Sequence, residues 1–443
     1  MRKLLFLFLL VCSSLQVFTQ VSIYNLFFNS DVNITKLDFN VLPPSVGYTG
    51  ISNGFEAIAH AEDGNGNVLF YVNASGVYRP NNIQMPGSVG ILANSSSAEM
   101  NVCLIPGETD KYYILYNDHT CSPLYYSIVD LSLAGGAGDV SALNVQIASS
   151  DFGEGMEVVR IPGTSNYWFV TYECNVGLMV FEINASGIQP GIVGLPTQLG
   201  GFAFDVRGEL DYHNGKLAIA CAWCSETFAC DFDPTTGITS NPITINTQAY
   251  GVEFSPDASK LYIADWGTPN PNFWQFDFST NTISNAYWIS PDPFSDVVTA
   301  GGGPGQIELG PDGKLYVIIS DWPPNLGEIV VIDNPNDLVV NFNIITTDYP
   351  LSLGISDHIQ SDILVPCLPP VANLTDTINI CDTSVTLTAD LAFSYLWSTG
   401  ETTQSIAVNQ SGDYWVQVCD PTLGEVLVYE NDFDSFIGSE WSD

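Results

Sequence analysis

The stretch GVEFSPDASKLYIADW, from Gly251 to Trp266, decides the fold prediction. Alternating apolar residues lie on both sides of a turn at Pro256 to Ser259, the pattern of two antiparallel strands joined by a tight turn. We expect the first strand over Val252 to Ser255 and the second over Lys260 to Ala264. The stretch is therefore a predicted β-hairpin.

This hairpin pattern recurs along the chain. The clearest copy, GQIELGPDGKLYVIISDW, begins at Gly305, and GELDYHNGKLAIACAW begins at Gly208, while weaker copies begin at Gly54, Ala98 and Gly155. A spacing close to that of one four-stranded blade predicts an all-β fold, a β-propeller. The residues that open the second strands are Asn67, Lys111, Asn166, Lys216, Lys260 and Lys314, at steps of 44, 55, 50, 44 and 54 residues.

The two ends of the repeat region predict how the ring closes. Ser22 to Asn40 offers strands without an inner partner, and Leu353 to Leu364 offers an inner strand without followers. Joining them in one blade removes the open edges of the ring. We therefore expect a seven-bladed propeller over residues 21–366, with a six-bladed ring as the alternative.

The chain begins with two basic residues, an apolar run and a polar end, the pattern of a secretory signal over residues 1–20. Removing Arg2 and Lys3 with it takes the formal net charge from −39 to about −41. Such an excess of acid repels phosphate backbones and anionic membranes. We expect a secreted or cell-surface protein that neither binds nucleic acid nor inserts into a membrane, and the oligomeric state stays open.

Nine cysteines remain after the signal, in an oxidising setting. Cys381 and Cys419 flank a small module and are predicted to form a disulfide, while Cys103 with Cys121 is a weaker candidate pair. Three further cysteines form a cluster in the sequence: Cys221, Cys224 and Cys230. This cluster fits structural disulfide bonding better than zinc or redox chemistry, because only the distant His213 could supply a fourth zinc ligand.

A Glu stands at the start of the first strand in every visible copy of the hairpin. Because innermost propeller strands line a central channel, equivalent positions form a ring. Carboxylates so close together take up protons or a cation, and Ca²⁺ suits an oxygen-rich site, whereas in a wide, wet channel they would simply be solvated. The six residues are Glu56, Glu99, Glu157, Glu209, Glu253 and Glu308.

Aromatic and acidic residues follow the second strands, where the chain returns to the channel mouth. Indole rings stack on sugars while acidic oxygens accept bonds from their hydroxyls, so these residues form a candidate glycan site. Packing of the Trp side chains between blades is the alternative. The mouth residues are Trp223, Asp265, Trp266, Asp321 and Trp322.

Catalytic signatures are sparse in this sequence. The His-Glu-x-x-His motif is missing, and no catalytic residue is assigned. Asp63 to Asn67 resembles the start of a calcium loop, but Ala74 stands at its twelfth position, which favours a plain turn. A glycan hydrolase or lyase using two channel Glu residues stays open as the alternative to a binding function.

A second module follows the blades at residues 367–427. Alternating strands surround Cys381, Trp397 and Cys419, the spacing of a small immunoglobulin-like sandwich, and Tyr414 fits its tyrosine corner. Residues 428–443 are expected to begin a further, truncated module.

Together these stretches carry a family resemblance. YGVEFSPDASKLYIAD, YYSIVDLSLAGGAGDV and GPDGKLYV resemble the N-terminal propeller of large Bacteroidetes surface proteins, and YLWSTGETTQSIAVNQSGDYWVQV resembles their immunoglobulin-like or PKD-like modules. The resemblance implies export through a type IX secretion system, although the C-terminal sorting domain of that family is missing. It implies no catalytic residues.

We therefore expect a secreted binding or adhesion protein that recognises a glycan or another surface protein at the channel mouth. A glycan-processing enzyme and a spacer without a ligand are the two alternatives. No cofactor is expected apart from possible Ca²⁺ at the ring of Glu residues.

Overall fold

The hairpin at Gly251 is present in the computed structural model of the chain. Strand β19 spans Gly251–Phe254 and pairs antiparallel with β20, Lys260–Asp265. In the turn between them the Asp257 carboxylate accepts a hydrogen bond from the Ser259 amide at 2.9 Å. The structure describes residues 24–30, 32–51, 56–93, 99–196, 207–222, 226–265, 272–285, 303–320, 327–339, 341–357, 385–388, 394–397, 405–408 and 416–419.

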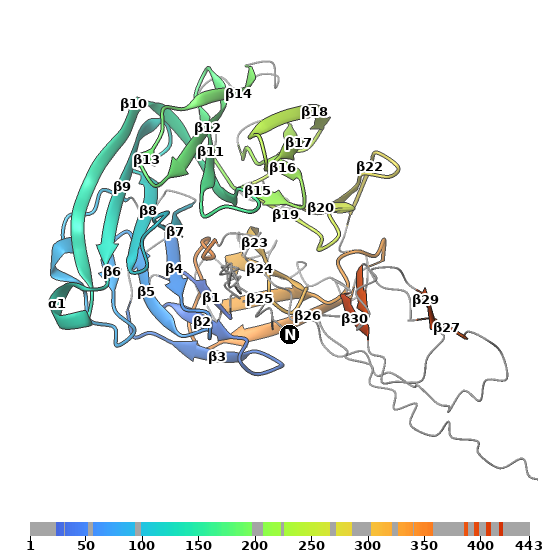
Figure 1. Cartoon of the computed structure of the whole chain (residues 1–443), viewed down its shortest axis with the longest axis horizontal. Helices are drawn as coiled ribbons and strands as arrows, with labels where there is room; N and C mark the ends of the chain where they lie inside the picture. Colours follow the sequence, from blue (N-terminus) through green and yellow to red (C-terminus); the bar gives the residue numbers. More distant parts are fainter. Residues whose placement is uncertain are drawn as a thin grey trace, which may run out of the picture.

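Each of the three strongest hairpins grows into a four-stranded antiparallel sheet (Figure 1). Strand β20 is buried along its whole length, because both faces of its sheet are covered by neighbouring sheets. The sheets are β15 (Leu210–His213), β16 (Lys216–Ile219), β17 (Thr227–Asp233) and β18 (Ile238–Ile245); β19 and β20 with β21 (Asn272–Asp277) and β22 (Thr282–Asn285); and β23 (Gly303–Leu309), β24 (Leu315–Ser320), β25 (Gly327–Ile332) and β26 (Phe342–Thr347).

The weaker copies of the hairpin also fold as predicted. One begins the sheet of β4 (Ile58–Glu62), β5 (Val68–Asn73) and β6 (Gly76–Tyr78), and Asp63 to Asn67 forms a plain turn in which Asp63 accepts bonds from Asn65 and Asn67. The other two share the 22-residue strand β10 (Asp139–Arg160), which pairs with β9 on one side and β11 on the other. Their further strands are β7 (Asn101–Leu104), β8 (Lys111–Asn117), β9 (Ser122–Asp130), β11 (Tyr167–Glu173), β12 (Gly177–Asn184), β13 (Gly187–Ile188) and β14 (Ile192–Pro196).

Helix is confined to one turn each in α1 (Leu133–Gly136) and the 3-10 segment η1 (Pro86–Ser88) in the part of the chain that the structure describes. Within the same residues, no helix has the length and apolar character needed to cross a bilayer.

The first and last strands of the repeat region meet, as the leftover segments predicted. The sheet of β1 (Asn25–Phe28), β2 (Thr35–Asp38) and β3 (Ser45–Tyr48) receives the segment at Ile355 beside β1. The Ser356 amide donates to the carbonyl of Phe27 at 2.8 Å, and the Asn29 amide donates to Gly354 at 2.8 Å. The sheets thus form an all-β, propeller-like ring that is joined through both ends of the repeat region (Figure 1).

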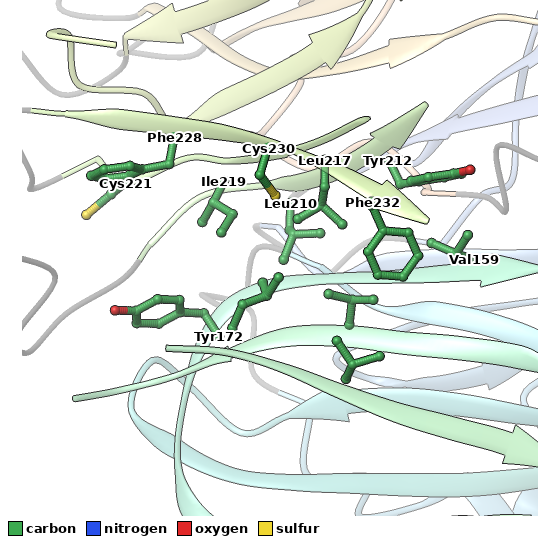
Figure 2. Packing of buried hydrophobic residues seen from close by; sticks show 13 residues of the cluster. Val159, Tyr172, Leu210, Tyr212, Leu217, Ile219, Cys221, Phe228, Cys230 and Phe232 are labelled. Atoms are coloured by element: carbon green, nitrogen blue, oxygen red, sulfur yellow. The ribbon is translucent and has the colours of Figure 1, made fainter. Parts of the chain in front are cut away.

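Apolar side chains fill the space between neighbouring sheets. Figure 2 shows Val159 and Tyr172, from β10 and β11, facing residues of the β15 to β18 sheet that include Leu217 and Phe228. At the edge of this layer the indole of Trp168 donates to the carbonyl of Pro234 at 2.8 Å. Burial of these large side chains, each worth about 1.5–3 kcal/mol, holds successive sheets together.

Glycines allow the innermost strands to approach one another closely. A Cβ atom on Gly208 would lie 2.6 Å from the carbonyl oxygen of Tyr250, and one on Gly251 would overlap the carbonyl oxygen of Gly305. In the space so freed, the Glu209 amide donates to the carbonyl of Tyr250 at 2.9 Å. Backbone therefore contacts backbone from sheet to sheet around the centre of the ring.

The described residues after Asp357 form four short strands. They pair as β27 (Val385–Thr388) with β29 (Ser405–Val408) and β28 (Ser394–Trp397) with β30 (Val416–Cys419). Cys419 ends β30, whereas its predicted partner Cys381, the linker and residues 1–20 and 428–443 lie outside the described residues. The immunoglobulin-like sandwich and the domain boundaries stay predictions.

We predict that Gly251→Ala lowers the free energy of unfolding by ~1–3 kcal/mol, because the added methyl group forces β19 away from β23. Urea unfolding followed by tryptophan fluorescence measures the change. Gly64→Ala is the control, since Gly64 is exposed and its added Cβ meets nothing within 4 Å. Equal midpoints for the two variants would show that the close approach is not a constraint.

Candidate functional site

The innermost strands bring acidic side chains to one central cavity. It measures about 180 Å³ including the part open to solvent, and its central space of about 10 Å³ fits one water molecule. Besides the carboxyl groups, Leu210, Val252 and Ile307 line it. The acidic residues are Glu99, Glu157, Glu209, Asp211, Glu253, Glu308 and Asp357.

Two of these Glu side chains hold neighbouring strands together. The carboxylate of Glu209 accepts the amide of Val252 at 2.8 Å and the amide of Ile307 at 3.2 Å, so it connects its own strand to β19 and β23. Glu99 likewise accepts the amides of Leu210, at 2.8 Å, and of Met156. Both oxygens of each carboxylate are thus occupied by backbone donors.

The reason for these bonds lies in the edge of each sheet. An innermost strand pairs with its own sheet on one side only, so the amides that face the channel have no strand to donate to. Carboxylates fill that role elsewhere in the cavity too. Asp211 accepts the amide of Phe254 at 2.9 Å, and Glu253 accepts the amide of Leu309 at 3.0 Å.

Glu157 differs from these residues. It lies in β10 with 1% of its surface exposed, and its Oε1 atom has no hydrogen-bond partner in the structure. Burial is the main cause that raises the pKa of its carboxyl well above the ordinary value, and the charges of Asp357 and Asp211 add to the effect. Glu157 is therefore a buried carboxyl group whose proton is lost only at a pH above the ordinary range, and one of its oxygens is unused in the cavity.

The pKa of Asp211 is also raised, into the neutral range. Burial raises it to about 7, while bonds from Glu253 and from the amides of Phe254 and Tyr212 oppose the rise. Near neutral pH Asp211 therefore exchanges protons readily. Burial also raises the pKa values of Glu99, Glu209, Glu253 and Glu308 well above the ordinary range.

Glu56 is the one predicted ring residue that does not line this cavity. Its side chain is 6% exposed, and burial raises its pKa to about 7 against opposing contributions from Tyr250 and Arg207. Asp357 lines the cavity instead, on the segment that closes the ring, where the Asn101 side chain donates to it. The ring thus contains residues that the Glu pattern did not indicate.

Two sequence signals could have found the missed acids. Asp211 lies two residues after Glu209, and alternate residues of a strand share a face. Asp357 lies in the predicted inner strand Leu353 to Leu364, the segment left without followers. The alternative of a wide channel with solvated Glu side chains is wrong, because these side chains are buried and hydrogen bonded.

Neither the predicted Ca²⁺ site nor most of the predicted channel-mouth residues can be placed in the described structure. Among the described residues, no three His, Cys, Asp or Glu side chains stand in a metal-ligating arrangement, and Ca²⁺ at the Glu ring stays a prediction. Asp265 ends β20 and is buried. The remaining mouth residues lie outside the described ranges: Trp223, Trp266, Asp321 and Trp322.

The structure places another cysteine beside Cys121 than the weaker expectation did. The sulfur of Cys121 lies 2.8 Å from the sulfur of Cys174, so Cys174, and not Cys103, is the cysteine next to it. The cause is topological, since Cys103 lies within β7, opposite Tyr113 of β8, whereas Cys121 lies in the turn after β8. Of the later cluster, Cys230 is a buried thiol in β17, and Cys224 lies outside the described residues.

Comparison with known proteins gives a fold likeness and little sequence likeness. No family model and no curated protein matches the chain. A proposed 6-phosphogluconolactonase from Bacteroides uniformis is 11% identical with a TM-score of 0.45, over 75% of this chain and 98% of that one. The periplasmic gluconolactonase of Pseudomonas aeruginosa is 12% identical, also with a TM-score of 0.45, over 76% and 99%.

These findings correct the expected binding or adhesion function. The similar structures are named for lactonase activity, not for adhesion or glycan binding. The Glu side chains offered as a binding surface are also buried, and Glu99 and Glu209 are occupied by backbone amides.

We predict that the free energy of unfolding falls as pH rises from 5 to 8. The folded chain keeps protons that the unfolded chain releases near pH 4.5, so stability is full below that pH and is lost as pH passes through the raised pKa values. Glu56 alone, with its pKa near 7, accounts for roughly 3 kcal/mol.

Urea unfolding at pH 5, 6, 7 and 8 measures this dependence. Glu157→Gln cannot ionise and should make the fall smaller, whereas Glu182→Gln, on β12 away from the cavity, should leave it unchanged. Stability that rises over this range would contradict the protonated cavity.

Proposed function

We propose that this protein is a hydrolase that uses the carboxyl groups of its central cavity as acid and base on a sugar-derived ester or lactone. One observation carries the proposal: Glu157 has an uncommitted, buried carboxyl oxygen in the same cavity as Asp211, whose pKa is about 7. Two carboxyl groups with different affinities for a proton supply an acid and a base at one pH.

The chemistry follows from these two roles. Ionised Asp211 removes a proton from a water molecule in the central space, and the water oxygen forms a bond to the substrate carbonyl carbon. The carbonyl oxygen accepts a hydrogen bond from protonated Glu157 as it gains negative charge. When the ester C–O bond breaks, Glu157 gives its proton to the leaving oxygen, and the proton on Asp211 then passes back to Glu157.

The size of the cavity indicates where the water molecule and the substrate would bind. Its centre accommodates one water molecule and not a sugar ring, so the carbonyl group of the substrate is expected in the part that opens to solvent. Glu99 and Glu209 position the strands around it, since both oxygens of each accept backbone amides. Fixed strands keep the acid and the base at a constant separation.

Glu157→Gln and Asp211→Asn are each expected to lower kcat/KM for lactone hydrolysis by about 10²–10⁴. Gluconolactone and a panel of simple sugar lactones, esters and aryl glycosides are the assay substrates. In the unaltered protein kcat/KM should rise with pH through about 7, as Asp211 ionises.

Glu56→Gln is the matched control, because Glu56 is also a buried Glu with a raised pKa but does not line the cavity. Its variant should keep the activity. Equal loss in all three folded variants, or no hydrolysis of any substrate by the unaltered protein, would rule out the proposed function.

The architecture around this activity is proposed on the sequence pattern. We infer that the ring is a seven-bladed propeller, that an immunoglobulin-like module follows it, and that the chain is exported with its signal removed. The six recurring hairpins and the pairing of β1 with the segment at Ile355 support the blade number. The N-terminal apolar run supports export.

A further inference from the structure

Two cysteines that are 53 residues apart in sequence meet across strand β10. Cys121 lies in the turn before β9, and Cys174 directly follows β11, while β10 runs between those strands in the same sheet. Their sulfur atoms are 2.8 Å apart, closer than two non-bonded sulfurs ordinarily approach. A disulfide has a length of about 2.05 Å, so the sulfurs need to move by only about 0.8 Å.

The backbone holds both residues at this separation. The Cys121 amide donates to the carbonyl of Phe152, and the Cys174 amide donates to the carbonyl of Asp151, each at 2.7 Å. Two consecutive residues of β10 thus fix the two cysteines from opposite sides. Cys121 has a φ of 55°, the left-handed conformation that turns its chain sharply at this point.

We propose that Cys121 and Cys174 form a disulfide in the mature protein. One thiolate attacks an external disulfide, such as oxidised glutathione, and releases one glutathione thiol. The second thiolate then attacks the mixed disulfide and releases the other, so that two protein thiols lose two protons and two electrons to the glutathione pair. An exported chain meets such disulfides, whereas a cytosolic chain does not keep the bond.

The proposed disulfide would restrain the segment of β10 that leads to Glu157 in the central cavity. Strand β10 changes its register between Phe152 and Met156, and Glu157 follows at once. Beside Cys121, the Thr120 hydroxyl donates to Glu154 of the same irregular stretch. A covalent connection over β10 therefore limits the movement of the segment that leads to Glu157. This inference does not depend on the proposed hydrolase activity.

Trypsin offers a direct test, because the two cysteines fall in separate peptides with one cysteine each. Cleavage after Lys111, Arg160 and Arg207 gives peptide 112–160 with Cys121 and peptide 161–207 with Cys174. The mature full-length chain is refolded in a glutathione redox buffer, alkylated, digested without reduction and analysed by mass spectrometry. We expect the two peptides as one linked species that dithiothreitol separates.

Thermal unfolding gives a second readout. Closing a loop of this length should raise Tm by about 5 °C in the oxidised protein over the reduced one. Cys121→Ser and Cys174→Ser should each make the difference between oxidised and reduced protein smaller by this amount, whereas the control Cys103→Ser should leave it unchanged. Two separately alkylated peptides from the oxidised chain, or a link from either peptide to Cys103, would overturn the proposal even if a variant fails to fold.

Discussion

The structure depends on hydrogen bonds from backbone amides of the innermost strands to carboxylates of neighbouring sheets. Each innermost strand leaves amides facing the channel, and Glu99, Glu209, Asp211 and Glu253 accept them. Glycine at positions such as Gly251 brings the strands near enough for one carboxylate to reach two of them. A polar ring at the centre thus complements the apolar layers between the sheets.

The same ring creates an electrostatic conflict. Charged carboxylates are the best acceptors for amides, yet several of them in one buried cavity repel one another and lose hydration. The structure divides the roles: Glu99 and Glu209 use both oxygens on backbone donors, whereas Glu157 keeps one oxygen unused. A strand-joining carboxylate and a carboxyl group with an unused oxygen therefore arise from the same residue type at equivalent positions.

Much of this fold could be predicted from the sequence, because hairpins are local and their turns carry recognisable residues, as at Asp257. The site was harder to predict. The repeated Glu predicted Glu56 as a ring residue, but Glu56 lies outside the cavity. The same pattern missed Asp211 and Asp357, which line it. The contact of Cys121 with Cys174 crosses a whole strand, and no spacing in sequence encodes it. Contacts between distant strands depend on how far each sheet is rotated relative to its neighbour. The pattern of apolar residues in the sequence does not determine that rotation.

The joining of β1 to the segment at Ile355 has a consequence for how the protein folds. The Ser356 hydroxyl accepts the amide of Phe27 across 329 residues of chain. Contacts of such large sequence separation require the ends of a very long loop to meet, and they form slowly. The individual hairpins can form early, but the ring becomes one cooperative unit only after its last strand has been synthesised and has found its first.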